Sequence, residues 1–475
     1  MRKLRPLIAL AAAALPLAAC TTTNNYNYAE GDPGTVTTEG GIAEARAKNV
    51  ILFIGDGMGI STVTAARIYE GQKRGEPGED NALVFETFPN VALVKTYNTN
   101  AQVPDSAGTA TAMHSGKKTR MGVLGIGPDA VRGSCRDALA HPLPLLGEEA
   151  KEKGLALGIV STARITHATP ASVYARSADR DWEAAVPEAE AQYGCKDIAT
   201  QLVEADWDVA LGGGSAVFFG RDKGGARADA GADLPAAWAA RTGGTIARTA
   251  AELTAAPAGR PVLGLFSPSH MTYEAERREG STEPTLTGMT AQAIERLERD
   301  PDGFYLMVES GRIDHAHHAG KAGYALEEAV EFARAIRYAV EHTDPEETLI
   351  LVTADHSHVF TIAGYPRRGN DILGLVVPPA GETGSEEEPI IASDGKPYTT
   401  LGYGNGPGAI AGMAERPMPE TGLEAQQQAT IPLGSETHAG EDVALYATGP
   451  GATRARGVIE QNVIYEIIRK ALGWD

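Results

Sequence analysis

Cysteine is scarce in this chain, whose 475 residues include only three. Because Cys20 lies in a leader-like segment, Cys135 and Cys195 are the two that remain for the folded part. So few cysteines exclude a framework of several disulfides. An even number in an exported chain favours one disulfide between these two, and a pair of free buried thiols is the alternative.

A basic cluster is also missing beyond the first residues. Lys and Arg number 42 against 62 Asp and Glu, which gives a formal net charge of -20. This balance argues against nucleic acid as a partner. It would also repel an anionic substrate, so a phosphate site must be made locally positive by metal ions or arginine.

The apolar run in the first residues, MRKLRPLIALAAAALPLAAC, is too short to span a bilayer comfortably. Its basic start and small-residue end are typical of an export signal. The final four residues, LAAC, resemble the lipobox of bacterial lipoproteins, which predicts a signal peptide over residues 1–19 and acylation of the Cys20 thiol. An ordinary secretory signal that is cut nearby is the alternative.

The residue after Cys20 bears on the destination of the chain. Thr21, rather than Asp, favours the outer membrane of a Gram-negative bacterium, with the protein periplasmic or surface-exposed. The following segment is rich in Thr and Asn, and we expect a flexible tether over residues 20–47.

Several apolar runs of strand length end in glycine or polar residues. They are NVILFIGDGMG, LALGIVSTARITHATP, DVALGGG, GFYLMVES and ETLILVTADHSH, with helix-like sequence between them. Such runs are typical of buried parallel strands, whose carboxyl ends open to a crevice. The alternation of these runs with helix-like sequence predicts an α/β fold, a three-layer αβα sandwich around a mostly parallel sheet. The 43% of hydrophobic residues is ample for its buried core. We expect this fold over residues 48–475, with an insertion at about 365–437, where the pattern loosens.

The stretch VESGRIDHAHHAG, from Val308 to Gly320, places three histidines and two carboxylates together in a chain with only 11 histidines. If a helix begins near Ile313, Asp314 and His318 lie four residues apart on one face, as two ligands of one metal ion require. Glu309 ends the preceding strand, where it can hold a second ion.

Other residues of the metal-ligand type gather at the predicted strand ends and in ETHAGED. Each alone has a structural explanation, as a turn residue, a satisfied core histidine or a loop residue. Together they are denser than a structural role requires. These residues are Asp56, His167, Asp355, His356, His358 and His438.

In VPDSAGTATA, Ser106 stands before a run of small helix formers. A helix start suits either an N-capping serine or a bound anion.

Six motifs together resemble the alkaline phosphatase family. In the family's order they are IGDGMG, VPDSAGTATA, THATPASVYARSADR, ESGRIDHAHH, TADHSHVF and ETHAGED, and the resemblance extends from Asn49 to the C-terminus. YGCKDIATQL, GYPRRGND and YGNGPG make the chain more similar to the animal-type branch. The resemblance implies a crown-like insertion, a homodimer, and hydrolysis of many small phosphate monoesters through a phosphoserine on Ser106.

The resemblance also implies two zinc ions per subunit, held by the imidazole and carboxylate groups that suit zinc. The first zinc would be bound by Asp314, His318 and His438. The second would be bound by Asp56, Asp355, His356 and the Ser106 oxygen.

One magnesium ion per subunit is implied as well. Asp56 would bridge to it, and Thr169 and Glu309 would complete the site with the oxygen ligands that magnesium prefers. Arg180 matches the family's phosphate-binding arginine, whose planar fork would hold two phosphate oxygens.

The remaining histidines of these motifs are not expected to bind a metal ion directly. The animal-type pattern implies His167 beside the magnesium and His315 near the phosphate through water. His358 would orient a metal-binding neighbour, whereas His317 has no assigned role and is expected at the surface. Because Ser267 replaces a Glu of the animal-type calcium site, no calcium is predicted.

Two kinds of alternative stay open, a related hydrolase of the same superfamily and a non-enzymatic binding protein. A sulfatase of the same superfamily would need Pro-x-Arg after its nucleophile, which Ser106-Ala107-Gly108 lacks, and a phosphodiesterase would more often use Thr and lack an arginine placed like Arg180. A surface lipoprotein that only binds its ligand would have no need of Ser106.

Overall fold

The computed structural model describes residues 46–381 and 388–474. The expected signal peptide, Cys20 and all but the last two residues of the expected tether lie outside the described residues. Within the described ranges, no helix combines the length and the apolar character that crossing a membrane requires.

A ten-stranded sheet lies at the centre of the described residues, in the order β15-β2-β14-β8-β1-β7-β3-β4-β6-β5. β14 runs antiparallel to its two neighbours, β2 and β8. Every other pair of adjacent strands in this sheet is parallel. The mostly parallel sheet is therefore confirmed. Its strands are β1 (Asn49–Gly55), β2 (Asn90–Lys95), β3 (Ala156–Arg164), β4 (Val209–Gly213), β5 (Thr245–Ala247), β6 (Val262–Leu265), β7 (Phe304–Ser310), β8 (Thr348–Ala354), β14 (Val443–Thr448) and β15 (Gly457–Glu460).

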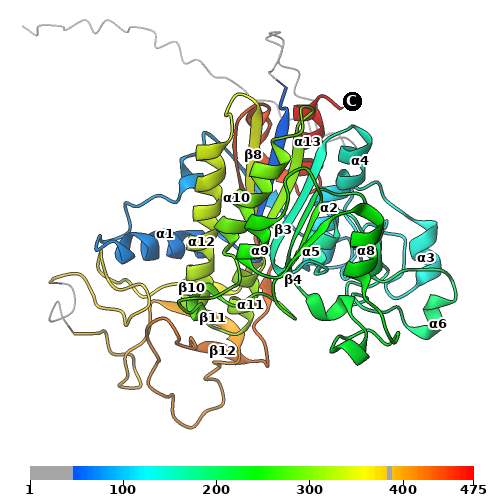
Figure 1. Cartoon of the computed structure of the whole chain (residues 1–475). Coiled ribbons are helices and arrows are strands. Elements are labelled where there is room, and N and C mark those ends of the chain that lie inside the picture. Colours follow the sequence, from blue (N-terminus) through cyan, green and yellow to red (C-terminus); the bar gives the residue numbers. More distant parts are fainter. Residues whose placement is uncertain (1–45, 382–387, 475) are drawn as a thin grey trace, which may run out of the picture. The chain divides into compact units, whose positions relative to one another are not determined.

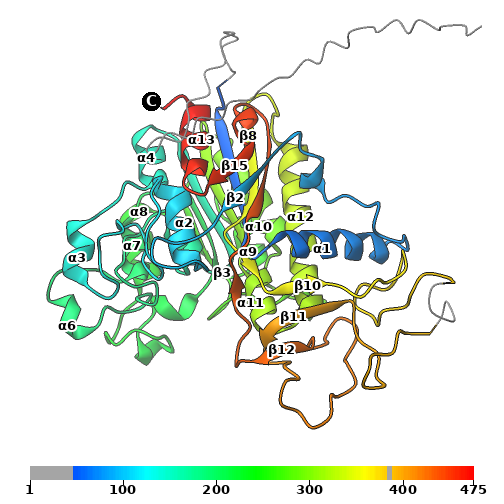
Figure 2. The ribbon, with the colours of Figure 1, turned by 180° about the vertical axis from the view of Figure 1, so that it is seen from behind.

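Helices cover both faces of this sheet, which makes three layers (Figures 1 and 2). α10 and α12 contact each other on one face, and α2 and α13 contact each other on the other. The αβα sandwich is therefore confirmed. The helices are α1 (Ile60–Lys73), α2 (Ser106–Ser115), α3 (Cys135–Ala140), α4 (Leu146–Glu152), α5 (Ala168–Ala171), α6 (Glu188–Ala191), α7 (Ile198–Glu204), α8 (Leu234–Thr242), α9 (Ala250–Ala255), α10 (Leu286–Leu297), α11 (Arg312–His318), α12 (Ala322–His342) and α13 (Val463–Leu472).

Strands β1, β7 and β8 lie side by side in the middle of the sheet. Every residue of the three is buried, as their continuous apolar sequence predicts. In register, Gly55 of β1 pairs with Ser310 of β7 and Ala354 of β8. Because parallel strands end on the same side, Asp56, Glu309 and Asp355 come together at one edge of the sheet.

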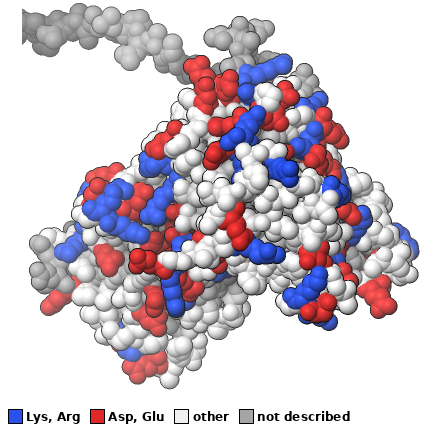
Figure 3. Space-filling view, in the orientation of Figure 1, with Lys and Arg blue, Asp and Glu red and all other residues white. Residues whose placement is uncertain are grey.

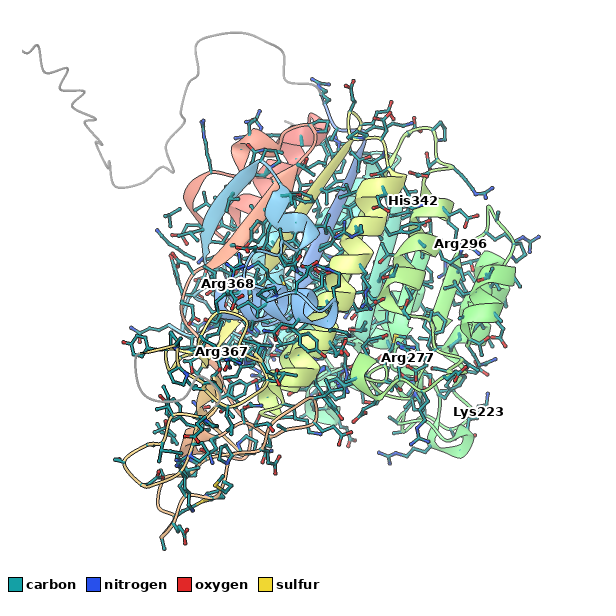
Figure 4. All side chains as sticks on the ribbon, turned by 90° about the vertical axis from the view of Figure 1, so that its left-hand side faces the viewer. Lys223, Arg277, Arg296, His342, Arg367 and Arg368 are labelled. Atoms are coloured by element: carbon teal, nitrogen blue, oxygen red, sulfur yellow. A yellow bond between two sulfur atoms is a disulfide. The ribbon has the colours of Figure 1, made fainter. Side chains whose placement is uncertain are left out.

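A smaller three-stranded sheet lies apart from the main one, in the order β10-β11-β12. The described residues between β10 and β11, 363–381 and 388–400, have little regular structure (Figure 1). Arg368, labelled in Figure 4, joins this region to the loop after α1 by an ion pair with Asp80. The bounds of the short strands are β9 (Ser357–His358), β10 (Phe360–Ile362), β11 (Leu401–Gly406), β12 (Ala429–Pro432) and β13 (His438–Ala439).

On the face that Figure 3 shows, basic and acidic side chains are interspersed.

Cys135 and Cys195 form a disulfide, so the alternative of two free thiols is wrong. The bond ties α3 to the segment before α7, beside a small separate core that includes Val123, Ile126 and Trp182.

Candidate active site

Helix α2 places the Ser106 hydroxyl at the edge of the sheet. The N-cap of this helix is Asp105, whose carboxylate accepts a hydrogen bond from the Gly108 amide at 3.1 Å. Because Asp105 caps the helix, the Ser106 oxygen is free for another role. It lies 3.1 Å from His356 Nε2 and 3.4 Å from Asp56 Oδ1.

Asp314, His318 and His438 converge beside this serine. Asp314 Oδ1 lies 3.3 Å from the Nε2 atom of each histidine, and the two Nε2 atoms are 3.1 Å apart. Ligand atoms about 2.1 Å from a tetrahedral zinc ion are themselves about 3.4 Å apart, so the three atoms fit one ion. Helix α11 supplies the Asp314–His318 pair, as its spacing predicts.

Asp56, Asp355 and His356 form a second group of potential metal ligands. His356 Nε2 lies 3.4 Å from Asp56 Oδ1 and 3.3 Å from Asp355 Oδ2, and all three side chains are fully buried. Burial, together with the neighbouring carboxylates, raises the pKa of Asp56 well above its usual range. A cation between these groups would remove that repulsion.

Three oxygen atoms near Glu309 are buried without a hydrogen-bond partner in the described residues: Asp56 Oδ2, Thr169 Oγ1 and Glu309 Oε1. They belong to the three residues expected at a magnesium site. The other Glu309 oxygen accepts a hydrogen bond from the Ser161 hydroxyl. Buried polar atoms are normally satisfied, and carboxylate and hydroxyl oxygens suit a hard cation, so the donor set fits magnesium.

Arg180 lies in the loop after α5 and lines the same cavity as Ser106. Its Nη1 donates to Asp105 at 3.1 Å and its Nη2 to His167 Nε2 at 3.1 Å. These two contacts leave three of the five guanidinium N–H donors for a ligand. His167 also lies in one group with Asp56 and Glu309, so it adjoins the candidate magnesium site.

A cavity of about 350 Å³ opens above these groups. His315 lines it and accepts a hydrogen bond at Nδ1 from Arg312 at 3.2 Å, so its Nε2 carries the hydrogen. The structure therefore gathers both predicted catalytic residues and several predicted ligands around one opening. Its lining comprises Ser106, Arg164, His167, Arg180, Asp181, Glu183, Asp314, His315, His318 and His438.

His358 lies behind the first group and bridges two carboxylates. Its Nε2 is 2.8 Å from Asp314 Oδ1, and its Nδ1 is 2.5 Å from Glu436 Oε2. Although burial would lower it, these contacts raise the pKa of His358 to about 9. His358 therefore contacts Asp314, one of the residues expected to bind the first zinc. The sequence predicts no role for Glu436. Its position two residues before His438, in the same motif, is the one indication that it lies near the site.

His317 corrects the prediction of a surface residue. Its ring is fully buried, with Nε2 3.0 Å from Thr62 Oγ1 and Nδ1 2.8 Å from Tyr403 Oη. Tyr403 belongs to β11 of the small sheet, which covers this side of α11. The ring is buried because it lies between Thr62 of α1 and Tyr403 of that small sheet.

Comparisons with known proteins agree with this arrangement. Residues 47–474 match the family model described as alkaline phosphatase. The chain is 46% identical over 443 residues to the tissue-nonspecific alkaline phosphatase of Gallus gallus, covering 88% of this chain and 83% of the relative. It is 44% identical to the alkaline phosphatase of Gadus morhua, covering 88% and 90% of the two chains.

Solved structures show the same similarity. The alkaline phosphatase of Thermus thermophilus has a TM-score of 0.67 and 27% identity, covering 90% of this chain and 92% of that one. The alkaline phosphatase of the Antarctic bacterium TAB5 has a TM-score of 0.63 and 25% identity, covering 91% and 99%.

Proposed function

The chain belongs to the alkaline phosphatase family, and from this premise we propose that it hydrolyses phosphate monoesters to an alcohol and inorganic phosphate through a phosphoserine on Ser106. The observation that carries the proposal is the position of the Ser106 oxygen. It lies among His356, Asp56 and the Arg180 cavity, where a nucleophile, a cation site and an anion-binding fork meet.

We propose two zinc ions and one magnesium ion per subunit. The first zinc would be held by Asp314, His318 and His438, whose donor atoms lie within 3.3 Å of one another. The second would be held by Asp56, Asp355, His356 and Ser106. The magnesium would be held by Asp56, Thr169 and Glu309, whose unpartnered oxygens support the assignment.

Ser106 is the nucleophile of the proposed reaction. Bound zinc would supply positive charge that favours the serine alkoxide and the developing charge on the leaving oxygen. As the bond from Ser106 Oγ to phosphorus forms, the bond from phosphorus to the alcohol oxygen breaks. Water then loses a proton and forms a new bond to phosphorus, the bond from phosphorus to Ser106 Oγ breaks, and inorganic phosphate leaves.

Arg180 binds the phosphoryl group throughout. Its remaining N–H groups donate two hydrogen bonds to non-bridging oxygens of the phosphoryl group. Its contacts with Asp105 and His167 fix the guanidinium plane. His315 offers its Nε2 hydrogen from the cavity wall, directly or through a water molecule. Because these contacts are all with the phosphoryl group, many leaving alcohols are accepted.

We also propose the organisation of the whole chain. Residues 48–475 would form the catalytic domain with its crown-like insertion at about 365–437, and this domain would pair as a homodimer. Residues 1–19 would be the signal peptide, and the acylated Cys20 and the tether 20–47 would attach the exported protein to the outer membrane. Labelling with a radioactive fatty acid, lost in Cys20→Ala, tests the anchor.

The activity is tested by hydrolysis of an aryl phosphate monoester beside the matching diester and sulfate ester, before and after chelation and restoration of zinc and magnesium. We expect monoester cleavage that chelation abolishes and both ions restore. Faster cleavage of the diester or the sulfate ester would contradict the proposal and favour another hydrolase of the superfamily.

Ser106→Ala separates catalysis from binding. We expect turnover to fall by about three orders of magnitude or more while zinc content stays close to that of the wild type. Ser115→Ala, at the other end of α2, is the matched control and should keep its turnover. A Ser106→Ala variant with wild-type turnover would exclude Ser106 as the nucleophile.

A further inference from the structure

Arg132, just before α3, holds the carboxylates on both sides of Arg180. Its Nε and Nη2 donate to the two oxygens of Asp179 at 2.9 and 2.8 Å, and its Nη2 lies 3.3 Å from Asp181 Oδ2. The first two contacts form the bidentate pair in which an arginine fork fits a carboxylate best. A single guanidinium therefore contacts both sequence neighbours of Arg180.

The backbone of Arg180 is linked to the same place through Gly122. The Arg180 amide donates to the Gly122 carbonyl at 2.8 Å, and the Gly122 amide donates to Asp105 Oδ2 at 2.9 Å. That Asp105 oxygen also accepts from Arg180 Nη1 at 3.1 Å. A methyl group on Gly122 would lie 2.3 Å from Arg132 Cζ, so the Arg132 guanidinium lies directly against this junction.

The ion pairs of Arg132 also change the charge beside the phosphate site. Asp181 lines the cavity, and its side chain is 79% exposed. In a chain with a formal net charge of -20, two uncompensated carboxylates beside the phosphate site would repel a phosphate ester. Arg132 offsets both of them, so that they oppose the positive charge of Arg180 in the cavity wall less.

We propose that Arg132 is a positioning residue for phosphate binding, which holds the segment 179–181 and offsets its two carboxylates so that Arg180 presents its fork to the phosphoryl group. This inference rests on the proposed function. The proposed role of Arg132 differs from a general structural one because its side chain is 43% exposed and its described ion pairs all go to Asp179 and Asp181.

The chain offers a close control. Arg136 lies in α3, four residues along the sequence, and its guanidinium lies 4.6 Å from the Tyr193 ring. It has the same charge and belongs to the same disulfide-linked region. If loosening this region were sufficient to weaken phosphate binding, Arg136→Ala would weaken it too.

The test compares full-length wild type, Arg132→Ala, Arg132→Lys and Arg136→Ala, each loaded with zinc and magnesium. The inhibition constant of inorganic phosphate, KM and kcat for an aryl phosphate, and zinc content are measured. We expect Arg132→Ala to raise KM and the inhibition constant about fivefold, with a smaller change in kcat and unchanged zinc content. Arg132→Lys should recover part of this loss because it keeps the charge without the fork, and Arg136→Ala should match the wild type.

If inorganic phosphate inhibits Arg132→Ala with the same inhibition constant as the wild type, the inference is overturned. A loss in Arg132→Ala that follows loss of zinc, or an equal loss in Arg136→Ala, would also overturn it. Arg132→Gln, which keeps most of the side-chain volume, gives the same test if Arg132→Ala does not fold. A wild-type enzyme that neither cleaves monoesters nor binds phosphate would instead overturn the proposed function, and the inference with it.

Discussion

The Nε2 atoms of His318 and His438 face each other across 3.1 Å. Each ring has its Nδ1 against a backbone carbonyl, His318 at Glu436 O (2.6 Å) and His438 at Pro104 O (2.8 Å). When both rings are neutral, donation from Nδ1 leaves a lone pair on each Nε2 atom, and these two lone pairs face one another. A cation that binds both nitrogens removes their repulsion, which couples metal binding to the stability of this part of the fold.

Removal of zinc should therefore destabilise the protein as well as inactivate it. Binding to the folded state alone stabilises by about 4 kcal/mol at a free ligand concentration of 1,000 times Kd. We expect chelation to lower Tm and added zinc to restore it, as measured by calorimetry. The double variant His318→Ala and His438→Ala is the control and should lose most of this zinc-dependent shift. An equal shift in the double variant would mean that zinc stabilises from another place.

Glu436 should set the zinc affinity without binding zinc. Its Oε2 holds His358 at 2.5 Å and its Oε1 accepts from the Val359 amide at 2.8 Å. Glu436→Gln keeps an acceptor for Val359 but removes the charge opposite His358, which orients Asp314. We expect zinc affinity to fall about 10- to 100-fold in competition with a chelator.

The control for this variant is Glu441→Gln, from the same motif. Glu441 accepts a hydrogen bond from the Ser357 hydroxyl at 2.7 Å. Its substitution should leave zinc affinity close to the wild-type value. Unchanged affinity in Glu436→Gln would show that His358 keeps Asp314 in place alone.

His317 should matter for stability. Its two ring nitrogens link Thr62 of α1 to Tyr403 of β11. His317→Ala removes both contacts and leaves a buried cavity, so we expect the free energy of unfolding to fall by about 3 kcal/mol in denaturant titrations. Tyr403→Phe removes one hydrogen bond and should cost about 1 kcal/mol. A His317→Ala protein as stable as the Tyr403→Phe protein would mean that the ring packing contributes nothing.

The contrast between Asp56 and His317 shows how far the sequence could predict this site. Asp56, Glu309 and Asp355 follow continuous apolar runs, and parallel strands bring their carboxyl ends together whatever the details of the fold. His317 depends on partners 255 and 86 residues away, and no local pattern encodes a contact with the small sheet. Glu436 is similar, because its partner His358 lies 78 residues earlier. Residues placed by strand ends or helical spacing were predictable, whereas those placed by long-range packing were not.

Glu328 should make the fold less stable at alkaline pH. It lies on α12, is 3% exposed, and accepts a hydrogen bond from the Glu274 amide at 2.6 Å. Burial raises its pKa from 4.5 to about 8, although the Glu274 amide and Arg312 act in the opposite direction, and the Glu274 carboxylate raises it further. Because the folded pKa lies above the unfolded one, the stabilisation is complete below about pH 4.5 and is lost as pH rises through 8.

Glu328→Gln keeps the acceptor for the Glu274 amide and removes the titration. We therefore expect its Tm to exceed that of the wild type by several degrees at pH 9, with a much smaller difference at pH 5. Calorimetry at pH 5, 7 and 9 measures the gap, and Glu341→Gln, an exposed residue of the same helix, should follow the wild type throughout. A gap that does not change with pH would mean that Glu328 stays ionised in the fold. A gap that widens toward pH 9 would mean that this buried carboxyl destabilises the protein under the alkaline conditions for which its family is named.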